Sequence, residues 1–160
     1  MEPSKVKSLV ESAEKKKVKA IGMIMSQLSS EKAVMRKFSA LFLGSMSIRT
    51  LQSLAKSEIV KFLQDRFDYF EKAIEKGGDF RAFNPLGSQS WLEKKQIIEM
   101  VNPDAPHLLI TLEGLFKKYN LKITRKLHPI MLTKMDSKGK LEDILPLAPH
   151  QRLYSYIYLE

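Results

Sequence analysis

Apolar residues recur at helical spacing in four successive stretches of the first 78 residues. The clearest stretch follows Ser57 and ends at Gly77 and Gly78, which suit the left-handed conformation that ends many helices. Its apolar members share one helical face: Ile59, Phe62, Leu63, Phe67, Phe70 and Ile74. An aromatic stripe of this kind is typical of a buried helix face rather than of a cofactor pocket. The pattern therefore predicts a helical region over residues 1–78.

Three further helices are predicted upstream of that stretch. The first covers residues 4–28 and carries a stripe of aliphatic side chains. The second is predicted to begin at an N-cap, either Ser29 or Ser30, and to end at Gly44. A short helical piece over residues 47–56 completes the set.

After residue 78 the pattern changes to extended segments interrupted by one helix. Extended segments are predicted where β-branched and aromatic residues gather, at residues 79–84, 96–101, 121–135 and 152–160. The intervening helix is predicted from residues that share a face: Leu108, Leu109, Leu112, Leu115 and Phe116. Asn120 suits the left-handed end of this helix, and residues 136–139 form a turn. From residue 96 onward the predicted order is strand, helix, strand, strand.

About the last 80 residues resemble the ACT-type amino-terminal domain of the large bacterial NAD-specific glutamate dehydrogenases. The resemblance rests on the order and spacing of several short motifs rather than on one signature. They are Phe80–Pro85, the strand and loop Ile97–Pro106, His128-Pro129-Ile130, Asp136 with Gly139-Lys140-Leu141, and Ser155. The helical first half matches the family only in its general layout.

The resemblance implies an α+β fold: an N-terminal helical bundle (1–78) followed by a partial ACT-like, ferredoxin-like β-α-β-β unit (79–160). A complete unit has a second helix and a fourth strand, so this one is expected to be truncated after its third strand. The strand at residues 96–101 is then expected to have an unpaired edge. Either residues 80–84 fill that edge, or a second copy of the chain pairs across it, and we expect self-association.

The resemblance also implies a function. The chain would be the non-catalytic N-terminal regulatory or assembly region of an NAD-dependent glutamate dehydrogenase, partnered by the remainder of that polypeptide. The parent enzyme would interconvert L-glutamate with 2-oxoglutarate and ammonia. For this chain alone we expect no catalytic, cofactor-binding or metal-binding residues. None of the seven glycines forms the G-x-G of a dinucleotide-binding turn, and His107, His128 and His150 do not have zinc-site spacing.

ACT-type domains commonly bind amino acids near the first strand-to-helix loop. Carried over by position, the candidate effector residues here are Asn102, Asp104 and His107. Free N–H groups at a helix start favour a carboxylate, and an acidic neighbour can accept an α-amino group. In the alternative interpretation, which we favour, Asp104 simply caps the helix.

Composition narrows the alternatives. The chain of 160 residues has no cysteine, so it has neither disulfides nor a thiol nucleophile. No apolar run reaches the length of a membrane span, and the start does not resemble a signal peptide, so a cytoplasmic location without a membrane partner is expected. The net charge of +9 includes a lysine-rich segment at residues 5–19. Nucleic-acid binding is disfavoured because this segment lacks arginine and aromatic residues. A free-standing small-molecule-sensing or interaction module remains the alternative function.

Overall fold

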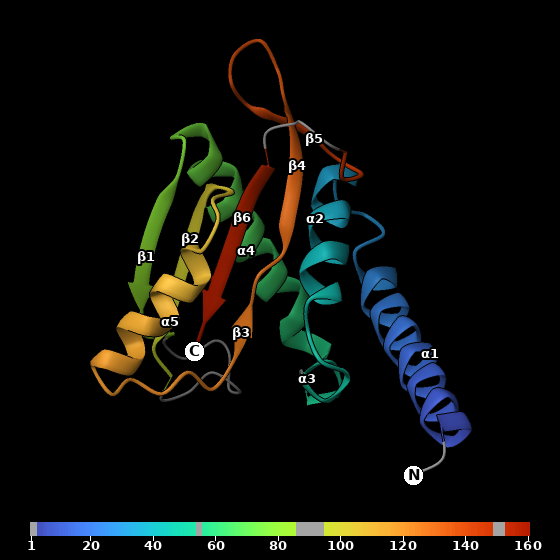
Figure 1. Ribbon diagram of the computed structural model, residues 1–160. Helices are drawn as coiled ribbons and strands as arrows, with labels where there is room; N and C mark the ends of the chain where they lie inside the picture. The colour runs from blue at the N-terminus through green and yellow to red at the C-terminus, as the bar shows by residue number, and fades with distance from the viewer. Residues whose placement is uncertain (1–2, 54–55, 86–94, 149–152) are drawn as a thin grey trace.

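The computed structural model describes residues 3–53, 56–85, 95–148 and 153–160, which form five helices and six strands (Figure 1). The helices are α1 (Pro3–Gln27), α2 (Ala33–Gly44), α3 (Ile48–Ser53), α4 (Lys56–Glu75) and α5 (Leu108–Lys118). The strands are β1 (Asp79–Phe83), β2 (Ile97–Pro103), β3 (Lys126–Leu127), β4 (Ile130–Met135), β5 (Leu141–Leu145) and β6 (Leu153–Leu159). The fold is therefore α+β, with four helices followed by a sheet-forming region, as expected.

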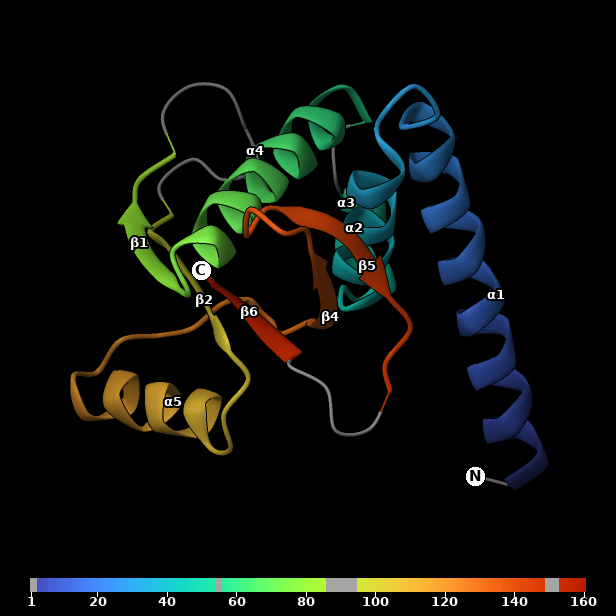
Figure 2. The same cartoon turned by 90° about the horizontal axis from the view of Figure 1, so that it is seen from above.

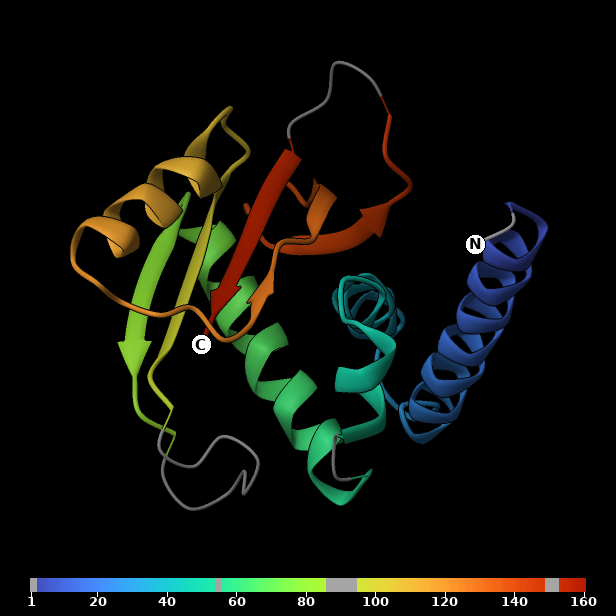
Figure 3. The ribbon, with the colours of Figure 1, turned by 60° about the horizontal axis from the view of Figure 1, so that its bottom comes forward.

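All strand pairs of the sheet are antiparallel, and the strand order is β1-β2-β6-β4-β5, with the short β3 also pairing with β6. Helices α2 and α4 cover one face of this sheet, while α5 lies on the opposite face (Figure 2). Helix α1 stands beside α2 and α3, away from the sheet (Figure 3). The sheet is thus covered on both faces, but by helices that differ in how deeply they pack.

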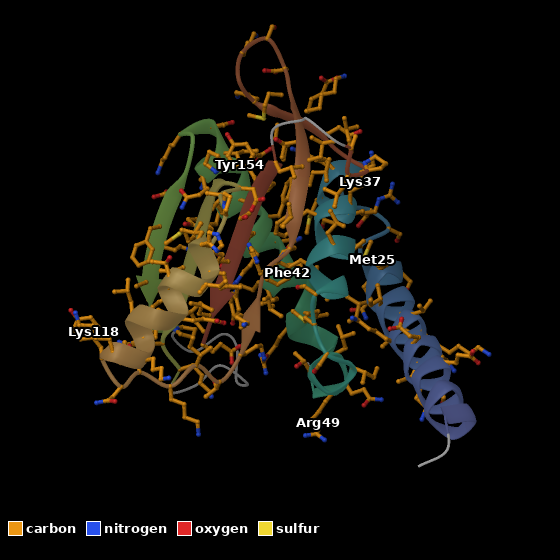
Figure 4. All side chains as sticks on the ribbon, viewed as in Figure 1. Met25, Lys37, Phe42, Arg49, Lys118 and Tyr154 are labelled. Atoms are coloured by element: carbon orange, nitrogen blue, oxygen red, sulfur yellow. The ribbon has the colours of Figure 1, made fainter. Side chains whose placement is uncertain are left out.

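Aromatic side chains from helices and strands meet at the centre of the core. The ring of Phe42 on α2 lies 5.3 Å from that of Tyr156 on β6, in an edge-to-face arrangement. Phe38 lies 5.2 Å from Phe70 on α4, and Phe42 sits where α2 faces the sheet (Figure 4). Rings at such distances gain energy beyond their area burial. Residues on both sides of the predicted boundary at 78/79 contribute to this one core.

Helix α4 buries the whole predicted stripe. Its six members are all 4% exposed or less: Ile59, Phe62, Leu63, Phe67, Phe70 and Ile74. The helix ends as predicted, because Gly77 and Gly78 have φ of 82° and 144°. Gly78 is also restricted by space, since a Cβ there would lie 2.6 Å from Asn102 Oδ1. This tight turn leads directly from α4 into β1.

The strand at residues 96–101 has no unpaired edge, because one of the two expected partners fills it. Strand β2 pairs with β1 on one side, where Phe80 faces Met100, and with β6 on the other, where Ile157 faces Met100. The segment at residues 80–84 therefore fills the edge, which was one of the two expected solutions. Strand β1 thereby takes the position beside the first strand that a fourth strand holds in a complete unit. Self-association stays a prediction, now without the edge argument in its favour.

The sequence did not predict strand β5. Leu141 and Ile144 are buried, but the adjacent Glu142 and Asp143 have low strand propensity and masked the pattern. The strand forms because a tight turn returns the chain, in which Asp136 Oδ1 accepts hydrogen bonds from the backbone N–H groups of Lys138 and Lys140. An ion pair of 2.7 Å between Asp143 and Lys37 then ties β5 to α2.

Two other boundaries also differ from the predictions. The extended segment at residues 121–135 is split into β3 and β4, because Pro129 cannot donate a ladder hydrogen bond. Helix α2 begins after Lys32, with no side-chain cap, rather than at Ser29 or Ser30. Asn120 does adopt the predicted left-handed conformation, with a φ of 55°.

Candidate effector site

The loop between β2 and α5 is anchored to the start of β6 through Asp104. The backbone N–H of Asp104 donates to the carbonyl of Leu153 over 2.8 Å. The Ser155 hydroxyl donates to Asp104 Oδ1. Ser155 is 1% exposed, whereas Asp104 is exposed at the surface. A buried hydroxyl thus fixes one oxygen of an exposed carboxylate.

The interpretation of Asp104 as a helix cap is wrong. Helix α5 begins at Leu108, and its N-cap is His107, which has a left-handed φ of 65° and makes no side-chain cap hydrogen bond. The carboxylate of Asp104 instead turns toward Ser155. Asp104 is therefore a loop residue held by the sheet, and no side-chain cap fills the first turn of α5.

His128 is an electrostatic neighbour of Asp104, although it lies far away in the chain. Partial burial lowers the pKa of His128, the Asp104 carboxylate opposes this shift, and Lys126 adds to it. Its Nε2 atom is buried and has no hydrogen-bond partner within the described part of the chain. Two motifs that carried the family resemblance, His128-Pro129 and Ser155, therefore converge on Asp104.

The other two candidate residues occupy different surroundings. Asn102 directs its side chain toward the α4–β1 turn, where Oδ1 occupies the space beside Gly78. His107 is exposed at the start of α5. No hydrogen bond within the described ranges joins Asn102, Asp104 and His107 to one another. His150, the third histidine, lies outside the described residues.

A second constellation, which the sequence analysis did not identify, surrounds the buried carboxylate of Glu99 on β2. Glu99 is fully buried and Arg66 of α4 is 1% exposed, with Arg66 Nε 2.8 Å from Glu99 Oε1. The angle at Arg66 falls outside hydrogen-bond geometry, so this contact is an ion pair rather than a directed bond. Arg81 of β1 donates to Glu99 Oε2, and the Tyr156 hydroxyl donates to Oε1 over 2.8 Å.

Aromatic rings and a second carboxylate complete this constellation. The Arg66 guanidinium lies 4.3 Å from the centre of the Phe62 ring, and that of Arg81 lies 4.1 Å from the ring of Tyr69. Asp65 pairs with both arginines. We call Asp65, Arg66, Arg81, Glu99 and Tyr156 the Glu99 network.

The Glu99 network is structural in character. Its central carboxylate is closed to solvent, and its members come from α4, β1, β2 and β6, so it fixes the helix against three strands. Burial, followed by the charge of Glu99, raises the pKa of Tyr156 well above its ordinary value. The sequence did contain a signal: Glu99 interrupts the apolar run of β2, and Arg66 lies within the apolar stripe of α4. A charge at each of two core positions favours a buried ion pair.

The antiparallel sheet, its helices and the anchored β2–α5 loop define an ACT-like domain. Residues 38–160 match the family model of the glutamate dehydrogenase ACT1 domain. Because the match covers most of the chain, the protein belongs to this family. Comparisons with curated proteins and with solved structures gave no match.

The described residues contain neither a membrane-spanning helix nor a metal-binding cluster. None of the described helices is long and apolar enough to cross a membrane. Within the described ranges, no group of three or more His, Asp or Glu side chains is arranged to hold a metal ion.

Proposed function

We propose that this chain is the non-catalytic N-terminal regulatory region of an NAD-dependent glutamate dehydrogenase. The observation that carries the proposal is the match of residues 38–160 to the glutamate dehydrogenase ACT1 domain. The parent enzyme interconverts L-glutamate with 2-oxoglutarate and ammonia, and the remainder of its polypeptide is the partner of this region. The sequence agrees with a non-catalytic role, since its glycines form no G-x-G turn.

The regulatory part of the proposal concerns the β2–α5 loop as an amino-acid site. Asp104 Oδ1 is held by Ser155, and Oδ2 has no hydrogen-bond partner within the described residues, so it can accept an α-amino group. The first turn of α5 has no side-chain cap, and its backbone N–H groups suit a carboxylate. An α-amino acid carries these two groups on one carbon.

Thermal unfolding in the presence of single amino acids tests the effector site. A ligand at ten times its Kd adds about 1.4 kcal/mol to the free energy of unfolding and raises Tm accordingly. We expect at least one amino acid to raise the Tm of the wild-type chain. The control variant Asp68→Asn, which changes an exposed carboxylate on α4, should show the same rise. Asp104→Asn should abolish this shift. The effector site is refuted if no amino acid raises Tm, or if Asp104→Asn shows the same rise in Tm as the wild-type chain.

The reading frame downstream of Glu160 tests the parent enzyme separately. The proposal requires that it continue into a dehydrogenase domain with a dinucleotide-binding turn. A frame that continues into an unrelated domain would instead support the sensing-module alternative. For the chain alone, calorimetric titration with NAD should give no saturable heat, and a micromolar Kd would contradict the non-catalytic assignment.

A further inference from the structure

Helix α1 lies against α3 and the start of α4 along an open groove with an apolar floor. The groove has a volume of about 320 Å³. Ile24, Leu51 and Ile59 form a floor that is 6% exposed or less. Met23 is 47% exposed although it is apolar, because it borders this open space. Apolar surface left in water at a concave site favours an apolar ligand group.

Positive charge gathers at one end of the groove. Lys16 and Lys19 line it one to two turns before Met23, whereas the uncharged Gln27 lines it one turn after. The lysine ion pairs within the described ranges involve other residues: Lys37, Lys76, Lys126 and Lys134. The adjoining hollow on α1 adds Lys15 and a single acid, Glu11. The groove is therefore apolar along its floor and cationic at one end.

The apolar floor and the positive charge at one end indicate which class of ligand the groove can bind. A nucleic acid requires positive charge along the whole site and aromatic side chains for stacking. The groove has positive charge at one end only, and no aromatic residue lines it. An amphiphilic anion requires one charged end and an apolar remainder. The α1 residues from Lys16 to Gln27 span on the order of 16 Å, at 1.5 Å per residue, which accommodates an extended chain of about ten to twelve carbons.

We propose that the groove between α1 and α3 binds a medium-chain fatty-acid carboxylate, with its head group at Lys16 and Lys19 and its alkyl chain over Met23, Ile24 and Leu51. The site is separate from the β2–α5 loop. Most of its lining comes from α1, which precedes the segment matched to the family, so it does not depend on the proposed function.

Calorimetric titration with dodecanoate, below its micelle concentration, tests the proposal. We expect one site per chain with a Kd on the order of 10 µM. Lys16→Glu/Lys19→Glu should weaken binding about tenfold or more, because two attractions become repulsions. The matched double reversal Lys138→Glu/Lys140→Glu, in the exposed turn before β5, should leave the Kd unchanged.

The apolar floor and the sign of the charge are tested independently. Met23→Gln should weaken dodecanoate binding, whereas Val18→Gln, at a residue of the same helix that is 66% exposed and does not line the groove, should not. Dodecyltrimethylammonium, with the same chain length and the opposite charge, should bind far more weakly. The proposal is overturned by the absence of saturable dodecanoate binding, by equal binding of the cation, or by wild-type affinity in Lys16→Glu/Lys19→Glu.

Discussion

Helices α4 and α5 were predicted from the same kind of apolar stripe, yet they pack very differently on the two faces of the sheet. Helix α4 buries all six predicted stripe residues, whereas none of the residues of α5 is buried. Leu115, a predicted stripe member, is 45% exposed, and Ile110 is 66% exposed. Periodic apolar residues therefore predict that a helix forms, but the depth of its burial depends on what it packs against. On the α4 face, α1, α2 and α3 join the same core, whereas α5 lies alone on its face (Figure 2).

Truncation of one apolar side chain on each helix should give the largest difference. Phe67→Ala on α4 is expected to lower the free energy of unfolding by about 3–5 kcal/mol, because it leaves a cavity in the core. Leu115→Ala on α5 should cost about 1 kcal/mol or less, since its side chain is already half in water. Urea denaturation measures both. Equal losses would show that the two faces are packed alike.

Neutralising one carboxylate on each face gives an intermediate effect. Glu99→Gln should destabilise the protein by about 3 kcal/mol, because Arg66 and Arg81 lose the buried negative charge that compensates them. Glu113→Gln on α5, whose partner Lys126 is 43% exposed, should cost about 1 kcal/mol or less. If Glu99→Gln has the same urea midpoint of unfolding as the wild-type chain, the Glu99 network does not hold α4 to the sheet.

A smaller and gradual effect is expected at alkaline pH, again confined to the α4 face. Burial is the largest cause of the raised pKa values of Tyr69, Tyr156 and Tyr158. A nearby carboxylate raises each pKa further: Asp79 for Tyr69, Glu99 for Tyr156 and Glu160 for Tyr158. The unfolded chain loses these protons near pH 10, while the folded chain retains them. Stability should therefore be full below about pH 10 and fall as the pH rises above it.

Thermal unfolding at intervals from pH 8 to pH 11 measures this alkaline loss. Tyr156→Phe should flatten the decline, although it also removes a hydrogen bond to Glu99 and so lowers Tm at pH 8. Tyr119→Phe is the matched control, because Tyr119 lies beyond the end of α5 and is 67% exposed. A decline that follows Tyr119 rather than Tyr156 would contradict the assignment to the buried face.

Local patterns predicted the elements whose signals lie within one segment. The α4 stripe, the two-glycine end of that helix and the left-handed Asn120 are all set by neighbouring residues, and each is confirmed. Strand β5 was missed because its stability comes from a turn and from an ion pair between Asp143 and Lys37, which is distant in the chain. Register and strand order depend on such distant contacts. The sequence therefore left two alternatives for the neighbour of β2, namely residues 80–84 or a second copy of the chain.

The candidate site shows the same limit. The sequence placed Asp104 on a loop after the first strand of the resemblance, but it could not show that Ser155 fixes its carboxylate. Local capping preference pointed to a helix cap, because aspartate before a helix often has that role. The competing partner lies 51 residues away on β6 and outweighs the local preference.

The Glu99 network also determines which parts near the β2–α5 loop can move. Strand β2 cannot slide along its neighbours without separating Glu99 from Arg66 and Arg81. Such a shift would leave buried charges without their partners, which is energetically costly. Five residues after Glu99, at Asp104, the chain has left β2 and entered the loop that leads into α5, a helix with no buried residue. A force on the loop would therefore move α5 more easily than it would shift the sheet. The sheet and α4 are thus the more tightly packed part of the domain, and α5 is the less tightly packed part.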